Sequence, residues 1–278
     1  MKRKVEGSAA MSASGITLVI AGKSFRRYVT YRAATVAGLV TNLFFGIIRA
    51  YLFLAAAKYA GGTLAGYSQD QLIAYSAWTQ ALIGWLLIFG TWDLMLAINS
   101  GDIAAELCRP INVYWSWQAA DLGRAAQGLL FRGIPLLAGY ALFFPLSLPH
   151  SATVWVFFLV SLVLAALISF AWRFMVNCLS FWTLQNRGLM GFLFTLAMFL
   201  GGFIIPLEFF PDWARDVLNW LPFTQMVQMP LQIVAGRVTS VGGLWRILAG
   251  QAVWVPVLWA VASLVWRAGI RKLVVQGG

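Results

Sequence analysis

The chain alternates between long apolar stretches and short segments that carry most of its charges. A helix needs about 20 mostly apolar residues to cross about 30 Å of hydrocarbon, because each residue adds about 1.5 Å. Arg49 interrupts the first of the long stretches, and Arg132 and Pro135 interrupt the third. The stretches that are long enough lie near 33–57, 71–92, 127–148, 153–174, 189–205 and 244–266. The pattern therefore predicts an all-α membrane protein with six transmembrane helices.

The segment 16–32, which precedes the first stretch, mixes apolar and basic residues. Such a mixture suits a helix in the headgroup plane with its basic side chains toward anionic lipid. The alternative is that this segment extends the first transmembrane helix into the cytoplasm. We expect residues 1–32 to form a cytoplasmic N-terminus with an interfacial amphipathic helix, and residues 33–278 to form a single six-span transmembrane domain.

Composition excludes a water-soluble fold. Hydrophobic residues make up 61% of the chain and charged residues only 10%, whereas a soluble domain carries about 25% charged residues. Much of the surface must therefore face lipid. The net charge of +11 would suggest nucleic acid in a soluble protein. Here no basic face with interleaved aromatic residues occurs in a polar domain, so we expect no nucleic-acid partner.

The basic residues predict the orientation of the chain, because cytoplasmic loops carry an excess of Lys and Arg. With both termini inside, few basic residues remain on the outer side, namely Lys58, Arg215, Arg237 and Arg246. The cytoplasmic side then holds Lys2, Arg3, Lys4, Lys23, Arg26, Arg27, Arg32, Arg109, Arg124, Arg132, Arg173, Arg187, Arg267, Arg271 and Lys272. This bias favours an even number of spans with both termini cytoplasmic.

The cytoplasmic connection 99–126 contains a short helical pattern at 100–107. Ser100 or Asp102 is expected to cap its start, and Arg109-Pro110 ends it. The helix is expected to present Ile103 and Leu107 on one face. It is too short to be stable alone, which leaves two interpretations. It packs on its own bundle, or it docks on a cytoplasmic partner.

The outer connection 206–243 is too apolar for a free loop and too often interrupted by proline for a span. Its segment 212–220 has an amphipathic helical pattern bounded by prolines. Short helices that dip into the outer leaflet, or that are buried between spans, satisfy both facts. The prediction is therefore a set of short re-entrant or extracellular helices between the fifth and sixth spans.

Several motifs resemble those of ABC type-2 permeases, the six-span membrane subunits of exporters. The strongest is Ile205-Pro206-Leu207-Glu208-Phe209-Phe210-Pro211-Asp212-Trp213. It is followed by Leu221-Pro222-Phe223-Thr224 and then by Pro230 and Gly236. The segment Gly101-Asp102-Ile103 with Glu106, Leu107 and Pro110 resembles the same group, as does the ending Val275-Gln276-Gly277-Gly278.

The resemblance implies a permease that pairs with an identical or related second permease and docks on two ATPase subunits. It implies a coupling helix between spans two and three, formed by Gly101, Asp102, Ile103, Glu106, Leu107 and Arg109. It also implies extracellular or re-entrant helices carrying Pro206, Glu208, Phe209, Phe210, Pro211, Trp213 and Pro222. The implied location is a bacterial plasma (inner) membrane, and the implied activity is export of an amphipathic or lipid-like substrate.

The chain has no Gly-x-x-x-x-Gly-Lys-Ser/Thr phosphate loop. We therefore expect ATP and Mg²⁺ to bind a partner chain, and we expect no catalytic residue, metal site or cofactor here. Cys108 and Cys178 lack metal-ligand spacing and are expected to be unpaired thiols. An ion- or proton-coupled secondary transporter is the alternative, although repeated halves, which are frequent in such proteins, are not evident.

Two charged residues in apolar surroundings have open roles. Arg49 lies in the outer half of the first stretch, where an unpaired arginine is costly. It either reaches the outer headgroups or pairs with Asp70, or it is a cation of a substrate cavity or subunit interface. Glu208 either pairs locally or faces the translocation path.

Overall fold

The computed structural model describes residues 13–183 and 186–273. The basic start at residues 2–4 and the ending at 275–278, which entered the sequence predictions, lie outside these ranges. Within them the chain is helical, with turns and loops and one isolated bridge between Leu64 and Tyr67. An all-α fold, as predicted, is confirmed for the described residues.

Three helices among the described residues are long and apolar enough to cross a membrane. They are α2 (Arg32–Tyr59), α14 (Val241–Ile270), and α9 (Ala152–Cys178) with its short continuation η2 (Leu179–Phe181). They confirm the first, sixth and fourth predicted stretches. Helix α9 is the most buried of the three, and it packs against α14, α12 and α13.

The other three predicted stretches form shorter or interrupted helices. The second is divided into α3 (Gln69–Ala81) and α4 (Ile83–Leu86), and the fifth is the 14-residue helix α10 (Arg187–Leu200). The third consists of the consecutive segments α7 (Val113–Gly128), η1 (Leu129–Gly133) and α8 (Ile134–Tyr140). Its helix begins at Val113, well before the predicted start at 127, so much of the predicted cytoplasmic connection is helical.

Local chemistry explains these boundaries. Ser68 begins α3 with a capping box, because its side chain accepts from the Gln71 N–H and the Gln71 side chain accepts from the Ser68 N–H. Helix α4 ends at Leu87, whose φ of 49° is left-handed. Pro135 has no N–H to donate, and the π-helical turn η1 ends two residues before it, at Gly133.

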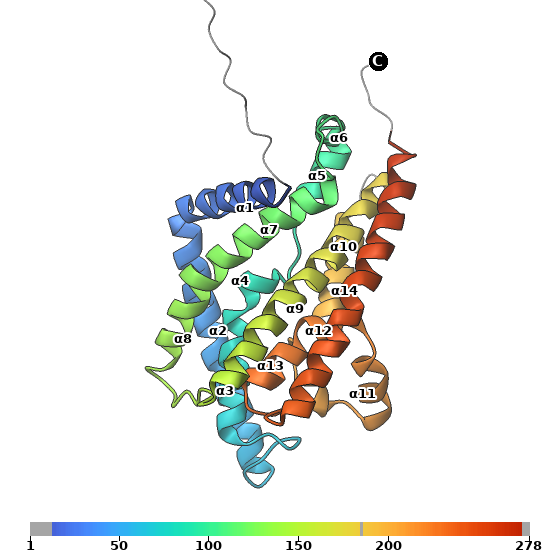
Figure 1. The fold of residues 1–278 in the computed structure, drawn as a ribbon. Coiled ribbons are helices and arrows are strands. Elements are labelled where there is room, and N and C mark those ends of the chain that lie inside the picture. Colours follow the sequence, from blue (N-terminus) through green and yellow to red (C-terminus); the bar gives the residue numbers. More distant parts are fainter. Residues whose placement is uncertain (1–12, 184–185, 274–278) are drawn as a thin grey trace, which may run out of the picture.

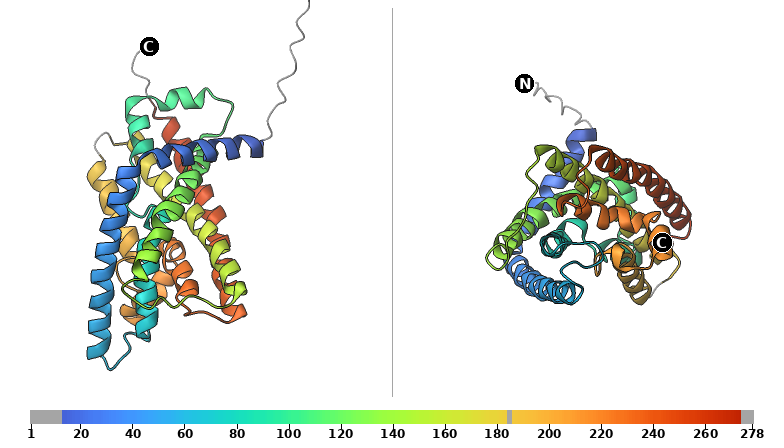
Figure 2. Two further views of the ribbon diagram at one scale, coloured as in Figure 1. Left: turned by 90° about the vertical axis from the view of Figure 1, so that its left-hand side faces the viewer. Right: turned by 90° about the horizontal axis from the view of Figure 1, so that it is seen from below.

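Different elements lie at the two ends of the bundle (Figures 1 and 2). Helix α1 (Ala13–Thr30) lies across one end, together with α5 (Asp93–Ser100), α6 (Ile103–Leu107) and the C-terminal end of α14. We call this the α1 end. At the opposite end, the α11 end, lie α11 (Asp212–Asn219) and the loop that follows α2. Because Tyr31 separates α1 from α2 and the two helices meet at a steep angle, α1 is not an extension of α2.

The segment after α10 forms the short elements η3 (Leu207–Phe209), α11, α12 (Pro222–Met226) and α13 (Gln228–Val234). Pro211 immediately precedes α11, and Pro222 is the first residue of α12, where its missing N–H costs nothing. The prediction of short helices bounded by prolines in this segment is confirmed.

Helix α1 packs closely on α7 at Gly123. A Cβ atom at this position would lie 2.0 Å from the Ala21 carbonyl oxygen. We expect Gly123→Val to separate α1 from α7, because a backbone oxygen cannot move aside without moving its helix. In a Cys108→Ser background, maleimide labelling of the thiol introduced by Ser24→Cys is expected to accelerate several-fold.

Gly22→Val is the matched control, since a Cβ at Gly22 would meet nothing within 4 Å. It should leave the labelling rate unchanged. Equal rates in the Gly123→Val and Gly22→Val proteins would contradict the close packing of α1 on α7.

Candidate functional site

The α5–α6 segment at the α1 end contains the residues that the sequence assigned to a coupling helix. The helix predicted at 100–107 is the shorter helix α6, and a second helix, α5, precedes it. Gly101, with φ of 82°, separates them in a left-handed conformation that glycine adopts without strain. Of the two predicted caps, Asp102 makes no side-chain capping bond, whereas the Ser100 hydroxyl accepts from the Asp102 N–H at 3.4 Å and donates to Asp102 Oδ2 at 2.7 Å.

Helix α6 has an inner and an outer side. Ile103 is fully buried, and the Glu106 carboxylate accepts a 2.6 Å hydrogen bond from Trp117 Nε1 of α7. Asp102, Leu107 and Arg109 are exposed. Ile103 and Leu107 are four residues apart in α6 and so lie on one face, as predicted, but Ile103 is fully buried whereas Leu107 is 37% exposed. The inner side fixes α6 to the bundle, and the outer side is free to bind another chain.

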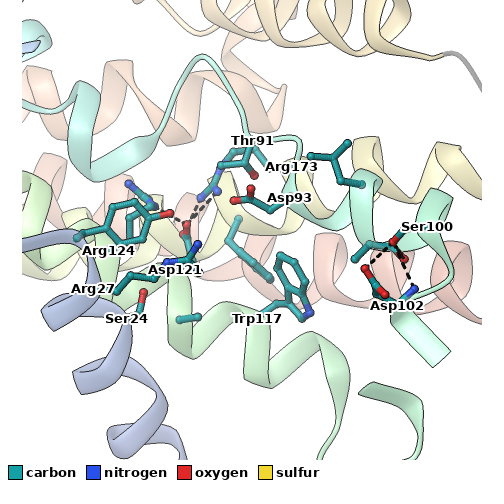
Figure 3. A pocket seen from close by; sticks show the side chains of 15 residues that line it. Ser24, Arg27, Thr91, Asp93, Ser100, Asp102, Trp117, Asp121, Arg124 and Arg173 are labelled. Atoms are coloured by element: carbon teal, nitrogen blue, oxygen red, sulfur yellow. Dashed lines mark hydrogen bonds and ion pairs between the residues drawn. The ribbon is translucent and has the colours of Figure 1, made fainter. Parts of the chain in front are cut away.

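A cavity of about 500 Å³ lies beside this segment, between α1, α5, α7 and α9 (Figure 3). Its walls carry three arginines and three aspartates, so the formal charges balance. The charged residues that line it are Arg27, Asp93, Asp102, Asp121, Arg124 and Arg173.

A buried triad of charged residues forms the inner wall of this cavity. Asp121 Oδ1 lies 2.9 Å from Arg124 Nε, and Arg173 binds both carboxylate oxygens at 3.0 and 2.7 Å. All three side chains are less than 10% exposed. Such a forked arginine–carboxylate geometry is among the stronger hydrogen-bonding arrangements in proteins. The triad therefore joins α7 to α9 at this end of the bundle.

The same residues support the end of the interrupted helix α4. Arg124 donates to the Gly84 carbonyl at 2.6 Å and to the Trp85 carbonyl at 3.4 Å, and Ser169 donates to the Leu86 carbonyl at 2.6 Å. These are carbonyls that the last turn of a helix leaves without internal partners. The termination of α4 inside the bundle is thus satisfied by side chains of α7 and α9. The sequence interpretation placed both arginines on the cytoplasmic side and missed this role.

Arg49 of α2 is bound by neutral oxygen atoms near the α11 end. Its Nη1 donates to the Phe203 carbonyl at 2.8 Å and its Nη2 to the Ser76 carbonyl at 3.0 Å. Its guanidinium carbon also lies 5.7 Å from the centre of the Phe203 ring. Of the alternatives for Arg49, pairing with Asp70 is wrong, because no ion pair joins these two described residues. Arg49 instead connects α2 to α3 and to the turn after α10.

Glu208 pairs locally. Its carboxylate accepts hydrogen bonds from the Tyr67 hydroxyl at 2.8 Å, from Gln228 Nε2 at 2.9 Å and from Gln232 Nε2 at 2.9 Å. The Arg237 guanidinium lies over the Tyr67 ring at 4.2 Å from its centre. This cluster ties η3 to α13 and to the loop before α3. Of the other residues predicted for this segment, Pro206 is buried, Phe209 and Phe210 are half-buried, and Pro211 and Trp213 are exposed.

Comparison with known families decides the identity of this bundle. A family model described as "ABC-2 family transporter protein" matches residues 44–277. The chain belongs to the ABC-2 transporter family. No curated protein matches it. The family assignment confirms the resemblance to ABC type-2 permeases and makes the chain a membrane protein of an ABC transport system.

The ABC-2 match extends over both segments that carry the sequence resemblance. It contains α6, the buried triad, and the short helices between α10 and α14. Helix α1 and the first turns of α2 precede residue 44 and lie outside the match. The family match therefore covers only part of the α1 end of this ABC-2 protein.

The Glu208 cluster of this ABC-2 protein gives a direct stability prediction. Glu208→Ala removes the shared acceptor of three donors, two of them from buried or nearly buried side chains. We expect a loss of about 2–4 kcal/mol in the free energy of unfolding. Thermal unfolding of the detergent-solubilised chain measures it.

Asp216→Ala serves as the control, since Asp216 is exposed on α11 and should tolerate the change. If Glu208→Ala and Asp216→Ala unfold at the same temperature, Glu208 does not hold these elements together.

Proposed function

We propose that the chain is the permease subunit of an ATP-driven exporter that moves an amphipathic or lipid-like substrate across a bacterial plasma membrane. The proposed assembly contains two ATPase subunits and a second permease, related or identical, with the substrate path at the permease interface. The observation that carries the proposal is α6. It is a short helix fixed to the bundle on one side and accessible on the other, at the end where basic residues gather.

In this proposal the chain crosses the membrane six times, with α3–α4, α7–α8 and α10 as the shorter crossings. Interrupted helices are tolerated at membrane depth only where the protein satisfies their backbone groups. The bonds from Arg124 and Ser169 to the α4 carbonyls meet that requirement. The α1 end is the cytoplasmic side, which agrees with its excess of Lys and Arg and with an even number of crossings.

Helix α11 then lies at the outer interface. Trp213 is 74% exposed and Trp220 is 81% exposed, with Val217 between them. Tryptophan is enriched where a membrane protein meets the headgroups, because its ring is apolar and its N–H is polar. These side chains support contact of α11 with the outer leaflet.

The contacts of α6 suggest how closure of the ATPase subunits would move the bundle. Glu106 holds Trp117 of α7, and Asp121 lies one helical turn further along the same helix. Asp121 binds Arg173 of α9, and Arg124 binds the end of α4. A displacement of α6 is thus passed to α7, and from there to α9 and α4, through a continuous set of charged and hydrogen-bonded contacts.

Purification of the tagged chain from its native host in mild detergent tests this function. We expect a stoichiometric ATPase subunit, ATP hydrolysis in the eluate and a second permease chain. A protein free of ATPase, with crosslinking in intact membranes to exclude loss in detergent, would contradict the proposal. Transport that persists without ATP but collapses with the proton gradient would then identify a secondary transporter.

A further inference from the structure

A basic groove lies where α1 meets α2, and the family match covers only its α7 and η1 wall. It has a volume of about 360 Å³ and is lined by side chains of α1, α2, α7 and η1 together with Tyr31. Its two charged residues are Arg27 and Arg132, and none of its lining residues is acidic. The groove differs in this respect from the neighbouring charge-balanced cavity, although Arg27 borders both.

Arg132 is held in an unusual position. It lies in the π-helical turn η1, and its guanidinium packs against α2 at Gly38, where a Cβ atom would lie 2.0 Å from Nη2. Its Nε is buried and has no hydrogen-bond partner. Because nearly all buried donors are bonded, this group is an unmet hydrogen-bonding capacity at the wall of the groove.

Arg27 and Tyr28 add further donors to the groove. Arg27 is exposed and forms no ion pair within the described residues. Burial, with a smaller contribution from Asp93, raises the pKa of Tyr28, so its hydroxyl stays protonated at neutral pH. The Tyr31 hydroxyl also lines the groove, whereas Gln127 Nε2 donates to Thr35 Oγ1 at 3.5 Å and Thr35 donates to the Tyr31 carbonyl at 3.1 Å. Two arginines beside the hydroxyls of Tyr28 and Tyr31 suit a phosphate group.

We propose that this groove binds the phosphate of an anionic phospholipid from the leaflet at the α1 end. Its neighbours in sequence favour a lipid over a free anion, since Val36 of α2 and Phe131 of η1 are 58% and 46% exposed apolar residues. Helix α2 is also long and apolar enough to cross a membrane. The bound headgroup would fix α1 against α2 and η1. This inference requires a membrane but does not depend on ATP-driven transport.

The test titrates the full-length wild-type and variant proteins with phosphatidylglycerol. Native mass spectrometry then compares how much lipid each protein retains. We expect Arg27→Gln/Arg132→Gln to weaken binding of the tightest lipid about 10-fold or more, because two charge-assisted contacts to the phosphate are lost. Arg26→Gln/Arg109→Gln is the matched control. It removes the same charge from two exposed arginines outside the groove, and should retain the lipid.

A charge-neutral variant separates a built site from general attraction to anionic lipid. Gly38→Leu displaces the Arg132 guanidinium while both arginines remain, and we expect it to lose the lipid as well. Gly22→Leu, with nothing within 4 Å of its added Cβ, should keep it. Equal retention in the wild-type, Arg27→Gln/Arg132→Gln and Gly38→Leu proteins would overturn the proposal.

Competitors distinguish the source of the phosphate. We expect phosphatidylcholine and about 10 mM inorganic phosphate to leave phosphatidylglycerol in place, because neither offers an anionic headgroup with acyl chains. Displacement by inorganic phosphate would overturn the lipid assignment and identify the groove as a site for a free anion.

Discussion

Asp121→Asn is expected to destabilise the folded chain by about 3–5 kcal/mol, the cost of leaving buried charges without their partner. Asp121 is the common partner of Arg124 and Arg173, and all three side chains are buried. Asparagine carries no charge, so two guanidinium groups would face each other beside the end of α4. The thermal unfolding midpoint of the purified chain should fall by many degrees, or no folded protein should be recovered.

The nearby Asp93 provides a matched control for this change. Asp93 lines the same cavity but is exposed and forms no ion pair within the described structure, so Asp93→Asn should change the midpoint little. A second variant separates lost charge from lost packing. Asp121→Leu/Arg124→Met/Arg173→Met removes all three charges, and we expect it to recover part of the stability. Equal midpoints for Asp121→Asn and Asp93→Asn would contradict a structural role for the triad.

Leu107→Glu/Arg109→Glu is expected to reduce co-purification of the ATPase subunit about 10-fold or more while the chain stays folded. Leu107 is the last residue of α6 and Arg109 follows the helix, and both side chains are exposed. A buried charge at the centre of an interface is costly, and a reversed charge repels a complementary partner. The readout is the molar ratio of ATPase to permease after purification, with the elution volume of the permease as the test of folding.

The control introduces two glutamates at the opposite, α11 end of the bundle. Tyr59→Glu/Lys58→Glu changes one exposed aromatic and one exposed basic residue at the C-terminal end of α2, and the ATPase ratio should not change. If the two double variants retain the ATPase equally, α6 is not its docking site. Ile103→Glu is expected to act differently, because a charge in its fully buried position should disrupt α6 itself.

The helices that the sequence predicted correctly are those formed by long continuous runs of apolar residues. Helices α2, α9 and α14 need only length and hydropathy, and they occur where expected. The end of α4 at Leu87 was not predictable, since it depends on Arg124 and Ser169 from two other helices. The apolar residues around Leu87 give no indication in the sequence that Leu87 adopts a left-handed conformation.

A local sequence signal, an N-cap residue, marks the early start of α7. Asn112 accepts a hydrogen bond from the Trp115 N–H at 3.3 Å, and asparagine is among the preferred N-cap residues. The polar residues that follow were interpreted as a loop. In the structure several of them, including Gln118 and Asp121, are buried within the bundle.

The candidate site was predictable in position but not in detail. The composition and spacing of residues 101–110 placed a short helix where α6 lies, although they did not separate its buried from its exposed side. Asp121 and Arg124 are three residues apart, so their contact is visible in the sequence of a helix. Arg173 is 52 residues away from Asp121, and only the packing of α7 on α9 brings it to the same carboxylate.

The most direct test of ATPase docking at α6 uses a native side chain. Cys108 follows α6 and is exposed, whereas Cys178 is buried, so a photoactivatable maleimide should label Cys108 selectively in inside-out membrane vesicles from the native host. After irradiation and mass spectrometry, the account predicts an adduct between this chain and an ATPase that carries a phosphate-binding loop. The adduct should be absent in a Cys108→Ser protein. Complete labelling of Cys108 without any ATPase adduct would contradict the docking of an ATPase at α6.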